Sequence, residues 1–473
     1  MEISQDILAL QANRRAFLSG SAFGLGSIAL STLMATSKAL GAEAPVSTHF
    51  GAKAKRVIFV YLIGGPSQVD LFDPKDELRR LDGQKIPESI LATSKFPFIS
   101  GTPNLMGSPY KFARHGQSAA HFSELLPQFA SVADDLAIVR SMQTEEVGHA
   151  AAELFFHTGF ARLGRPSFGC WTAYGLGTEN QNLPSYVVLS GQPTYAGSNT
   201  WGAGFLPSRH QGVKFRSGQE PIFYLRNPEG IDADDQGSVV DAVNRLNRHQ
   251  ATQVGDPEIE TRVSQYEMAF RMQSSVPDLM NLKTESPSTL DQYGAKAEEP
   301  SFAANCLIAR RLSERGVRFV QVCSNNWDHH EDIYTALPRA CQQVDRPLAA
   351  LIRDLKQRGM LDETLVIISG EFGRSPVVQD TAPNGRKGRP GRDHHKDAFT
   401  TILCGGGAKP GVTYGATDDL GMKPVENPVH VHDLHATALH LLGIDHKRLT
   451  YRYQGRNFRL TDVHGRVVQE ILA

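Results

Sequence analysis

The fold of this chain is decided by one stretch of sequence, VIFVYLIGGPS at residues 57–67. The first seven residues are apolar, and all but one are β-branched or aromatic, which is typical of a strand buried on both faces. The Gly-Gly-Pro turn that follows ends the strand abruptly. Such a strand belongs at the centre of a sheet that helices cover on both sides.

Five further apolar runs resemble this first one and stand between helical patterns. The runs lie at residues 136–139, 186–189, 317–322, 365–368 and 400–403. The helical patterns lie at residues 123–133, 301–315, 344–358 and 434–442. This alternation predicts an α/β fold with a mostly parallel central sheet flanked by helices. Ligands of such sheets bind beyond the carboxyl ends of the strands, so the loops after Ile63, Val322 and Ile368 are the first candidates for a site.

Composition and charge narrow the classes of function. The chain has 473 residues, of which 40% are hydrophobic and 21% charged, and this suits one large or two medium globular domains. A formal net charge of -1 creates no field that would recruit nucleic acid, so no nucleic-acid partner is expected. The five cysteines lie far apart without a CxxC pair, so neither a disulfide framework nor a zinc ribbon is indicated. We expect a single domain over residues 42–473, with surface excursions near residues 191–235 and 274–300.

Residues 1–41 are interpreted as a twin-arginine signal peptide. Arg14 and Arg15 stand directly before a weakly apolar run, which glycines interrupt and which small residues near Ala42 follow. The alternatives are a short amphipathic helix and a retained anchor. We expect the twin-arginine export machinery as a partner and a periplasmic or otherwise exported protein. No later stretch reaches about 18 apolar residues, so no permanent membrane span is expected in the mature chain.

Asp and His side chains gather in the loops that adjoin the predicted strands, where a divalent metal ion could bind. Asp328 and His330 are two residues apart, so on an extended backbone both point to the same side, and His394 comes from a later loop. Three such ligands leave a position open for water or substrate. Zinc is the first choice of ion, and Glu371 and Asp393 are further candidate ligands. Because ligand imidazoles must be neutral, occupancy should fall below about pH 6.

Other interpretations of these histidines stay open. One member of each pair could cap a turn or bind a backbone carbonyl, and spacing does not decide which member of His329/His330 or of His394/His395 is the ligand. His149 is a secondary candidate because it lies on a helical pattern. The histidines at residues 430, 432 and 435 are interpreted as local structure, since a helix with an apolar face begins among them.

Four residues are candidates for catalysis. Ser67 follows the turn after the first strand, where a hydroxyl beside a metal could act as the nucleophile, although it could equally cap the next segment. Asp70 could orient Ser67 or bind the metal. Arg374 and Arg392 adjoin the ligand candidates, so we expect one of them to hold an anionic ester.

With these motifs assembled, the chain resembles the exported family called domain of unknown function 1501, a branch of the alkaline-phosphatase-like, or sulfatase-like, superfamily. The points of resemblance are the twin-arginine start, GGPS at 64–67, FDPK at 72–75, WDHH at 327–330, EFGRSP at 371–376, GRDHH at 391–395, HDLHAT at 432–437 and YRY at 451–453. The resemblance implies an alkaline-phosphatase-like fold and a metal-assisted hydrolase of phosphate or sulfate esters. Its substrate would be an anionic small-molecule or polymer ester, and its nucleophile would lie nearest Ser67.

The departures from the superfamily pattern favour a second hypothesis. Gly64 stands where the superfamily has an Asp, and Phe372 stands where it has a His, which implies that the second of two usual metals is weakened or lost. The sulfatase signature is also missing, because Ile308 replaces the Pro or Ala that should follow Cys306 by two residues. The alternative to a hydrolase is a non-catalytic exported binding or scaffold protein with a degenerate site. A serine esterase is disfavoured, since no Ser has Gly on both sides at a distance of two residues.

Overall fold

The computed structural model describes residues 48–473, apart from residues 93–95, 97, 100, 217–220, 223–226, 228–229 and 380–388. Residues Ser47–Ala473 form one compact unit. The expected signal peptide at residues 1–41 lies outside the described residues, so export by the twin-arginine route stays a prediction. Among the described helices, none is long and apolar enough to cross a membrane.

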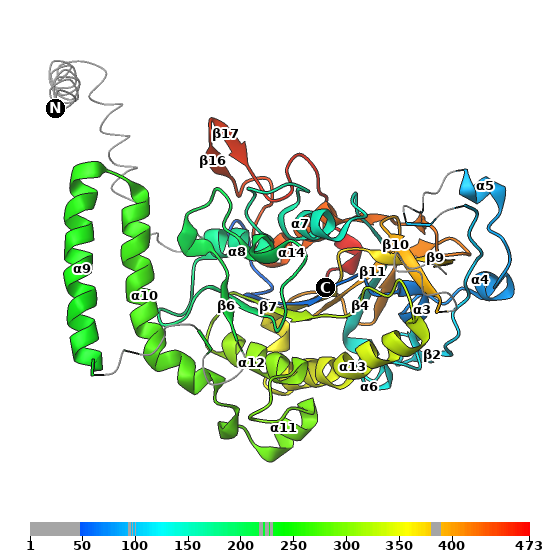
Figure 1. The fold of residues 1–473 in the computed structure, drawn as a ribbon, viewed down its shortest axis with the longest axis horizontal. Coiled ribbons are helices and arrows are strands. Elements are labelled where there is room, and N and C mark those ends of the chain that lie inside the picture. Colours follow the sequence, from blue (N-terminus) through cyan, green and yellow to red (C-terminus); the bar gives the residue numbers. More distant parts are fainter. Residues whose placement is uncertain are drawn as a thin grey trace. The chain divides into compact units, whose positions relative to one another are not determined.

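A nine-stranded sheet runs through the middle of this unit (Figure 1). Its strands in spatial order are β12 (Val412–Tyr414), β4 (Leu136–Gln143), β11 (Phe399–Cys404), β8 (Thr364–Ser369), β1 (Arg56–Leu62), β7 (Phe319–Ser324), β5 (Tyr186–Leu189) and β6 (Val213–Phe215), and β15 (Val429–His430) also pairs with β4. Strand β11 runs antiparallel to β8 and β4, while the other pairings are parallel. The expected fold class, α/β with a mostly parallel central sheet flanked by helices, is confirmed.

Strand β1 occupies the centre because both of its faces are apolar. Ile58, Val60 and Leu62 face one hydrophobic core, and the alternate side chains of Val57 and Phe59 face the other. The residue opposite Val57 is Phe319 on β7 and Leu365 on β8. This strand therefore joins the two layers of the molecule, as its continuous apolar sequence predicts.

Helices cover both faces of the sheet. In Figure 1, α12 (Phe302–Glu314) and α13 (Ile333–Gln357) lie below it, and α7 (His149–Thr158), α8 (Phe168–Leu176) and α14 (Val431–Leu441) lie above it. The other helices are α3 (Gln68–Leu71), α4 (Asp76–Arg80), α5 (Glu88–Leu91), α6 (Pro127–Ala130), α9 (Ala233–Val254), α10 (Pro257–Met280) and α11 (Pro287–Tyr293). Four two-stranded sheets complete the described structure: β2 (Phe112–His115) with β3 (Ala120–Ser123), β9 (Gly373–Gln379) with β10 (Gly391–His395), β13 (Ala416–Thr417) with β14 (Pro424–Glu426), and β16 (Tyr451–Tyr453) with β17 (Arg456–Phe458).

Two helices differ from the expected ranges for identifiable reasons. The pattern at residues 123–133 gives only the single turn of α6, because Pro127 restricts the preceding residue to extended conformations and β3 ends at Ser123. Helix α13 begins at Ile333, eleven residues before the expected start, and continues through Pro338 and Pro347. Its buried apolar face outweighs the cost of the two prolines.

The two expected surface excursions contain regular structure. Strand β6, within residues 191–235, adds to the edge of the main sheet beside β5. Within residues 274–300, α10 ends and α11 follows, and Val276 and Tyr293 are fully buried. Both segments therefore contribute to the packed body of the molecule.

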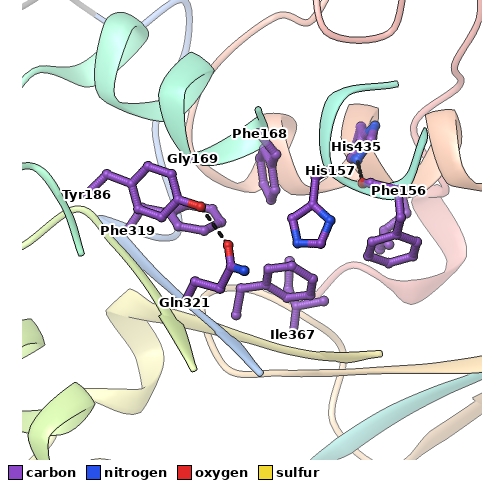
Figure 2. Close-up of a pocket in the computed structure, with 11 residues that line it drawn as sticks. Phe156, His157, Phe168, Gly169, Tyr186, Phe319, Gln321, Ile367 and His435 are labelled. Atoms are coloured by element: carbon purple, nitrogen blue, oxygen red, sulfur yellow. Dashed lines mark hydrogen bonds between the residues drawn. The ribbon is translucent and has the colours of Figure 1, made fainter. Parts of the chain in front are cut away.

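The core between the sheet and α14 holds two buried histidines (Figure 2). His157 bonds through Nδ1 to the backbone oxygen of Glu153, and His435 bonds through Nε2 to that of Phe156. Both line a cavity of about 10 Å³, the lower limit for one water molecule. Burial lowers the pKa of His157 to about 4 and that of His435 to about 3. The interpretation of the histidines near residue 435 as local structure agrees with these contacts.

The two histidines make stability depend on pH. Unfolded, each has the ordinary pKa of 6.5, so between pH 6.5 and about 4 the unfolded state binds more protons and the free energy of unfolding should fall as pH falls. Each contributes up to about 1.4 kcal/mol per pH unit. In His435→Gln, the free energy of unfolding measured by chemical denaturation should change less steeply with pH across this range. The difference in slope should correspond to about one proton. The exposed His464→Gln variant is the control, and an unchanged slope in His435→Gln would contradict the assignment.

Candidate metal centre

Five segments meet at the carboxyl edge of the sheet. The turn after β1 carries Gly64, the loop after β7 carries Asp328 and His330, and the loop after β8 carries Glu371. Strand β10 adds His394, and the fifth segment is the start of α7. Strand β4 runs parallel to β1, so the loop that follows it reaches the same edge and brings in α7. This is the edge at which open α/β sheets bind ligands.

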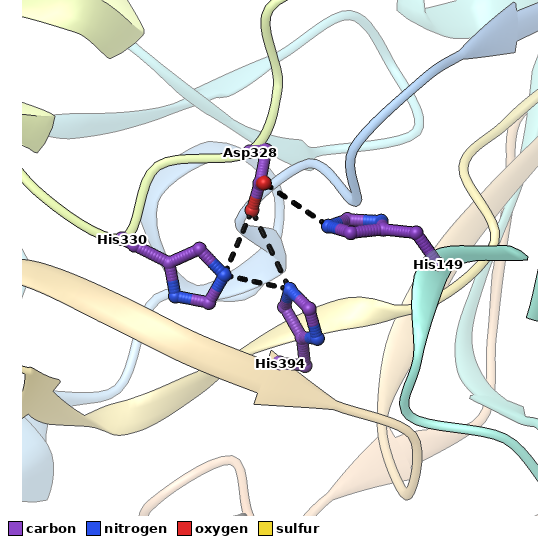
Figure 3. A group of neighbouring side chains, drawn as sticks. All are labelled: His149, Asp328, His330 and His394. Carbon is purple, nitrogen blue, oxygen red and sulfur yellow. Dashed lines mark hydrogen bonds and ion pairs between the residues drawn. The ribbon is translucent and has the colours of Figure 1, made fainter. Parts of the chain in front are cut away.

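Three imidazoles converge on one carboxylate there (Figure 3). His149 Nε2 lies 3.1 Å from Asp328 Oδ2, and His330 Nε2 and His394 Nε2 lie 3.0 and 3.4 Å from Asp328 Oδ1. The four ligand atoms are all within 4.8 Å of one another. Sequence reasoning identified Asp328, His330 and His394 as sharing one site, and the structure brings their side chains together.

His149 is the ligand that sequence reasoning ranked too low. It begins α7, and its ring faces Asp328 although the rest of the helix packs on the sheet. The sequence signal was the position of β4, because a strand parallel to β1 delivers the following helix start to the same edge. The helical pattern around His149 does not show which end of that helix approaches the site.

The outer nitrogen of each imidazole is already bound. Nδ1 of His394 bonds to the backbone oxygen of Val147 at 2.6 Å, and Nδ1 of His330 bonds to Gln379 Oε1 at 2.6 Å. Nδ1 of His149 bonds to Glu371 Oε1 at 2.6 Å. Because a carbonyl or carboxylate oxygen only accepts, each Nδ1 donates outward and each ring turns its Nε2 toward the centre. A metal ion bound there would take the Nε2 lone pairs in place of protons.

The spacing of these nitrogens suits a shared proton or a metal ion. Nε2 of His330 and Nε2 of His394 lie 2.8 Å apart, with Asp328 Oδ1 beside both. Acceptors that close repel one another unless a proton or a metal ion lies among them. Histidines oriented by a bond at the second nitrogen, as here, are the usual surroundings of a metal ion. The donor set of three imidazoles and one carboxylate suits zinc and similar divalent ions.

Opposing effects set the pKa values of the cluster. Burial acts to raise the pKa of Asp328, but hydrogen bonds from His149, His330 and His394 hold it far below its usual value. Burial acts to lower the pKa of His149, but its bonds to Asp328 and Glu371 raise it to about 9. Burial lowers the pKa of His394 to about 4, so this ring is neutral at physiological pH.

Arg374 supports Asp328 from below. Its Nη2 donates to Asp328 Oδ1 at 2.6 Å and also reaches the backbone oxygens of Gly64 and Trp327, while Nε and Nη1 donate to those of Gly65 and Arg392. The side chain has 0% exposure. Arg374 was expected to bind a substrate anion. Its donors are instead bonded within the chain, and they fix the carboxylate of Asp328.

Arg392, Asp70 and Ser67 form a second buried group. Arg392 pairs with Asp70 through Nε at 2.7 Å and Nη2 at 3.0 Å and also donates to three backbone oxygens. Ser67 Oγ donates to Asp70 Oδ2 at 2.6 Å, and all three side chains are buried. The expected orientation of Ser67 by Asp70 is present, but neither Arg392 nor Ser67 exposes a polar atom to a substrate.

The remaining candidate residues lie around the cluster. Glu371 is fully buried and accepts from His149, from the backbone amide of Gly64 and from the hydroxyl of Tyr61, so it orients His149 and lies outside the set of four. Although burial acts to raise its pKa, the bond from His149 keeps the pKa of Glu371 below the usual value. Asp393 accepts from the amides of Phe98 and His394 and takes no place among the four ligand atoms.

The neighbours His329 and His395 point elsewhere. His395 Nε2 bonds to the backbone oxygen of Met422, and His329 lines a neighbouring cavity. The structure therefore resolves the choice within each histidine pair in favour of His330 and His394.

Gly64 and Phe372 fix the shape of the centre. Gly64 has a φ of 117°, and a Cβ there would lie 2.4 Å from the amide nitrogen of Asp328, so only glycine lets the two loops approach. The ring of Phe372 lies 4.4 Å from that of His394 and 5.0 Å from that of His149. A buried phenyl group thus packs against two rings of the cluster at the sequence position where the resemblance implies a further ligand, and the described residues form one such cluster of four atoms.

A cavity of about 780 Å³ adjoins the cluster. Asp328 forms part of its wall, together with Tyr195, whose hydroxyl donates to Asp328 Oδ2 at 3.2 Å. The Tyr195 ring stacks on His149 with a centroid distance of 4.1 Å, and 52% of the residue is exposed. The metal centre is therefore open to small molecules on the side of Tyr195.

The cluster should hold one divalent ion per chain. His330→Ala and His394→Ala should each abolish stoichiometric binding, and Glu371→Gln should weaken it about 10- to 100-fold because the acceptor of His149 loses its negative charge. Elemental analysis and zinc titration of the purified protein measure both effects. His464→Ala, which changes an exposed histidine outside the site, should bind like the unaltered chain. Full ion content in His394→Ala would contradict the shared site.

The Asp70–Arg392 pair should be needed for folding. Asp70→Asn leaves the Arg392 charge buried without its partner, so the free energy of unfolding should fall by about 3–5 kcal/mol. Glu77→Gln is the matched control, because it removes an exposed ion pair to Arg80 on the neighbouring helix α4 and should change stability by less than about 1 kcal/mol. Urea denaturation of the two variants makes the comparison, and equal stabilities would refute the structural role.

Comparisons with known proteins give one family and several distant structures. A lipoteichoic acid synthase from Listeria monocytogenes is 12% identical, with 88% of this chain and 78% of that chain covered and a TM-score of 0.36. A sulfatase from Pseudoalteromonas sp. is 13% identical, with 89% and 71% covered and a TM-score of 0.35. An alkaline phosphatase from the Antarctic bacterium TAB5 is 13% identical, with 75% and 92% covered and a TM-score of 0.32.

Likenesses at these TM-scores carry no argument about activity. No curated protein matches the chain in sequence. The sequence model of one family, described as "Protein of unknown function (DUF1501)", matches residues 54–472, which is nearly the whole described structure. The resemblance seen in the motifs is thereby confirmed, and the chain belongs to the DUF1501 family.

Proposed function

We propose that this protein is an exported, metal-dependent hydrolase of phosphate or sulfate esters. The observation that carries the proposal is the set of four candidate ligand atoms, which lie within 4.8 Å of one another beside an open cavity. A divalent ion held by these atoms would polarise an ester oxygen and neutralise the charge that develops on it. An anionic small-molecule or polymer ester is the matching class of substrate. The proposal of export rests on Arg14 and Arg15 and on the apolar run after them.

Some residues of the site orient the candidate metal ligands, and another can form a hydrogen bond to the substrate. Arg374 holds Asp328, and Glu371 holds His149, so these two side chains are oriented toward the centre before an ion binds. Tyr195 lines the cavity with its hydroxyl beside Asp328. Partial burial and the Asp328 carboxylate raise the pKa of Tyr195 above its usual value, so the phenol keeps its proton. Once a metal ion occupies Asp328, this hydroxyl can turn from the carboxylate and donate its one hydrogen bond to an ester oxygen in the transition state.

Ser67 fits a supporting role better than that of nucleophile. Its side chain has 0% exposure, and its hydroxyl is occupied by Asp70, which Arg392 holds in turn. A nucleophile must reach the reacting atom. We therefore assign Ser67 to the buried support of the turn after β1, in place of the catalytic role expected from the sequence.

The second candidate function is a non-catalytic binding or scaffold protein. The observation that favours it is the engagement of all the expected catalytic groups: Ser67, Asp70, Arg374 and Arg392 are each buried and bonded within the chain. Both functions require the metal centre. They differ in whether an ester bond is broken at it.

Turnover at full metal occupancy separates the two functions. Bis(p-nitrophenyl) phosphate, p-nitrophenyl phosphate and p-nitrophenyl sulfate cover the classes of ester. Tyr195→Phe should keep its metal and lower kcat by about a hundredfold, because one donor to the reacting ester is lost. Ser67→Ala should keep both its metal and most of its kcat.

Two results would change this account. A loss of kcat by orders of magnitude in Ser67→Ala, with metal content intact, would restore Ser67 as the nucleophile. The absence of turnover of every ester by the fully loaded protein would favour the binding protein over the hydrolase.

A further inference from the structure

Helices α9 and α10 form a hairpin whose outer arm is α9. In Figure 1, α9 lies at the edge of the molecule, and α10 lies between it and the sheet. Helix α10 belongs to the packed body, because Met272, Val276 and Leu279 are buried in the core on the side of α12 and α13. Helix α9 is therefore attached to the body through α10.

The face of α9 that meets α10 is small and polar. A Cβ on Gly237 would lie 3.3 Å from the ring of Phe270, and Asn244 is buried with its Nδ2 3.4 Å from Glu267 Oε1. Arg248 donates to the same carboxylate at 2.7 Å. The contact with α10 thus depends on close approach and hydrogen bonds, and it leaves the larger apolar side chains of α9 elsewhere.

Those apolar side chains lie on the opposite face of α9. Val239 follows Gly237, and Leu246 follows Asn244, by two positions each, which turns them about 200° around the helix. Val239 is 54% exposed and Leu246 is 71% exposed. Ala242 is also exposed, and Val243 is half-buried. Apolar residues at i, i+3, i+4 and i+7 are typical of a helix face that packs on another element, yet the described residues leave this face open to solvent.

The charges of α9 are divided between its two halves. The N-terminal half carries Asp234, Asp235 and Asp241, and the C-terminal half carries Arg245 and Arg248. All five are exposed, and within the described part of the chain only Arg248 has an ion pair. An antiparallel copy of α9 would place each acidic half beside a basic half, whereas a parallel copy would place like charges together. The face is therefore complementary to itself in one orientation.

We propose that this face of α9 binds a second copy of the chain, with the two α9 helices antiparallel about a twofold axis near the middle of the helix. Val239, Ala242 and Leu246 of one copy are then buried against the same residues of the other. A self-complementary surface is what a twofold dimer requires. The inference concerns assembly alone and is independent of the proposed function, since α9 contributes no residue to the metal cluster or to the wall of its cavity.

The mass of the protein in solution tests the proposal. Sedimentation equilibrium of the mature chain at micromolar concentrations should give a dimer. Leu246→Glu places a charge at the centre of the interface in both copies, so the dissociation constant should rise by about a hundredfold. Leu163→Glu, which changes a similarly exposed leucine outside α9, is the control and should leave the dimer intact. Both residues are exposed, so the midpoint of urea denaturation at monomeric concentrations should stay unchanged in both variants.

Two further measurements test the antiparallel arrangement. Arg245→Asp should weaken the dimer by about tenfold, because it places like charges opposite one another. For crosslinking, the native cysteines are all buried, so a cysteine placed on α9 is the accessible one. With a mid-helix axis, Ala242→Cys should be crosslinked between copies by a short bismaleimide. Gln253→Cys should not, because the two thiols would lie about 27 Å apart along the helix at a rise of about 1.5 Å per residue.

Four results would overturn the inference. The first is a monomer at every concentration, and the second is a dimer that Leu246→Glu leaves intact. The third is efficient crosslinking of Gln253→Cys as well as Ala242→Cys, which would indicate parallel helices. The fourth is a full chain, residues 1–473, that stays monomeric while the mature chain dimerises, which would assign this face to the chain's own N-terminal residues.

Discussion

The convergence of three imidazole rings on one carboxylate is the constraint on which the rest of the site depends. Nε2 of His330 and of His394 lie 2.8 Å apart, a distance that two ring nitrogens tolerate only with a proton or a metal ion between them. Each Nδ1 is bonded to an oxygen outside the cluster, so each ring turns its Nε2 toward the centre. A bound divalent ion would meet all three Nε2 atoms and the carboxylate of Asp328 together.

Buried polar groups around the centre hold it in this arrangement. Arg374 joins the turn after β1 to Asp328, and Arg392 joins that same segment, through Asp70, to β10. Each arginine has all of its donors engaged, which makes the burial of its charge tolerable. Gly64 permits the close approach of the two loops, and Phe372 fills the space next to His394. The result is a centre for one ion with one open side.

The sequence predicted the fold and three of the four side chains of the candidate cluster because both follow from one rule. Continuous apolar runs mark parallel strands, and their carboxyl ends meet at one edge, so Asp328, His330 and His394 were expected to share a site. His149 ranked low because a helical pattern does not reveal which of its ends faces that edge. The arginines were assigned to substrate because they adjoin ligands in sequence, but adjacency carries no information about exposure. Likewise, the extent of α13 depends on tertiary packing that outweighs two prolines.

Anomalous diffraction from crystals of the mature protein grown with zinc, collected at the zinc absorption edge, tests the central claim most directly. One strong peak per chain is expected, about 2 Å from the Nε2 atoms of His149, His330 and His394 and from a carboxylate oxygen of Asp328. Two peaks at this edge of the sheet would contradict the role given to Phe372. No peak among the four side chains would contradict the metal centre itself.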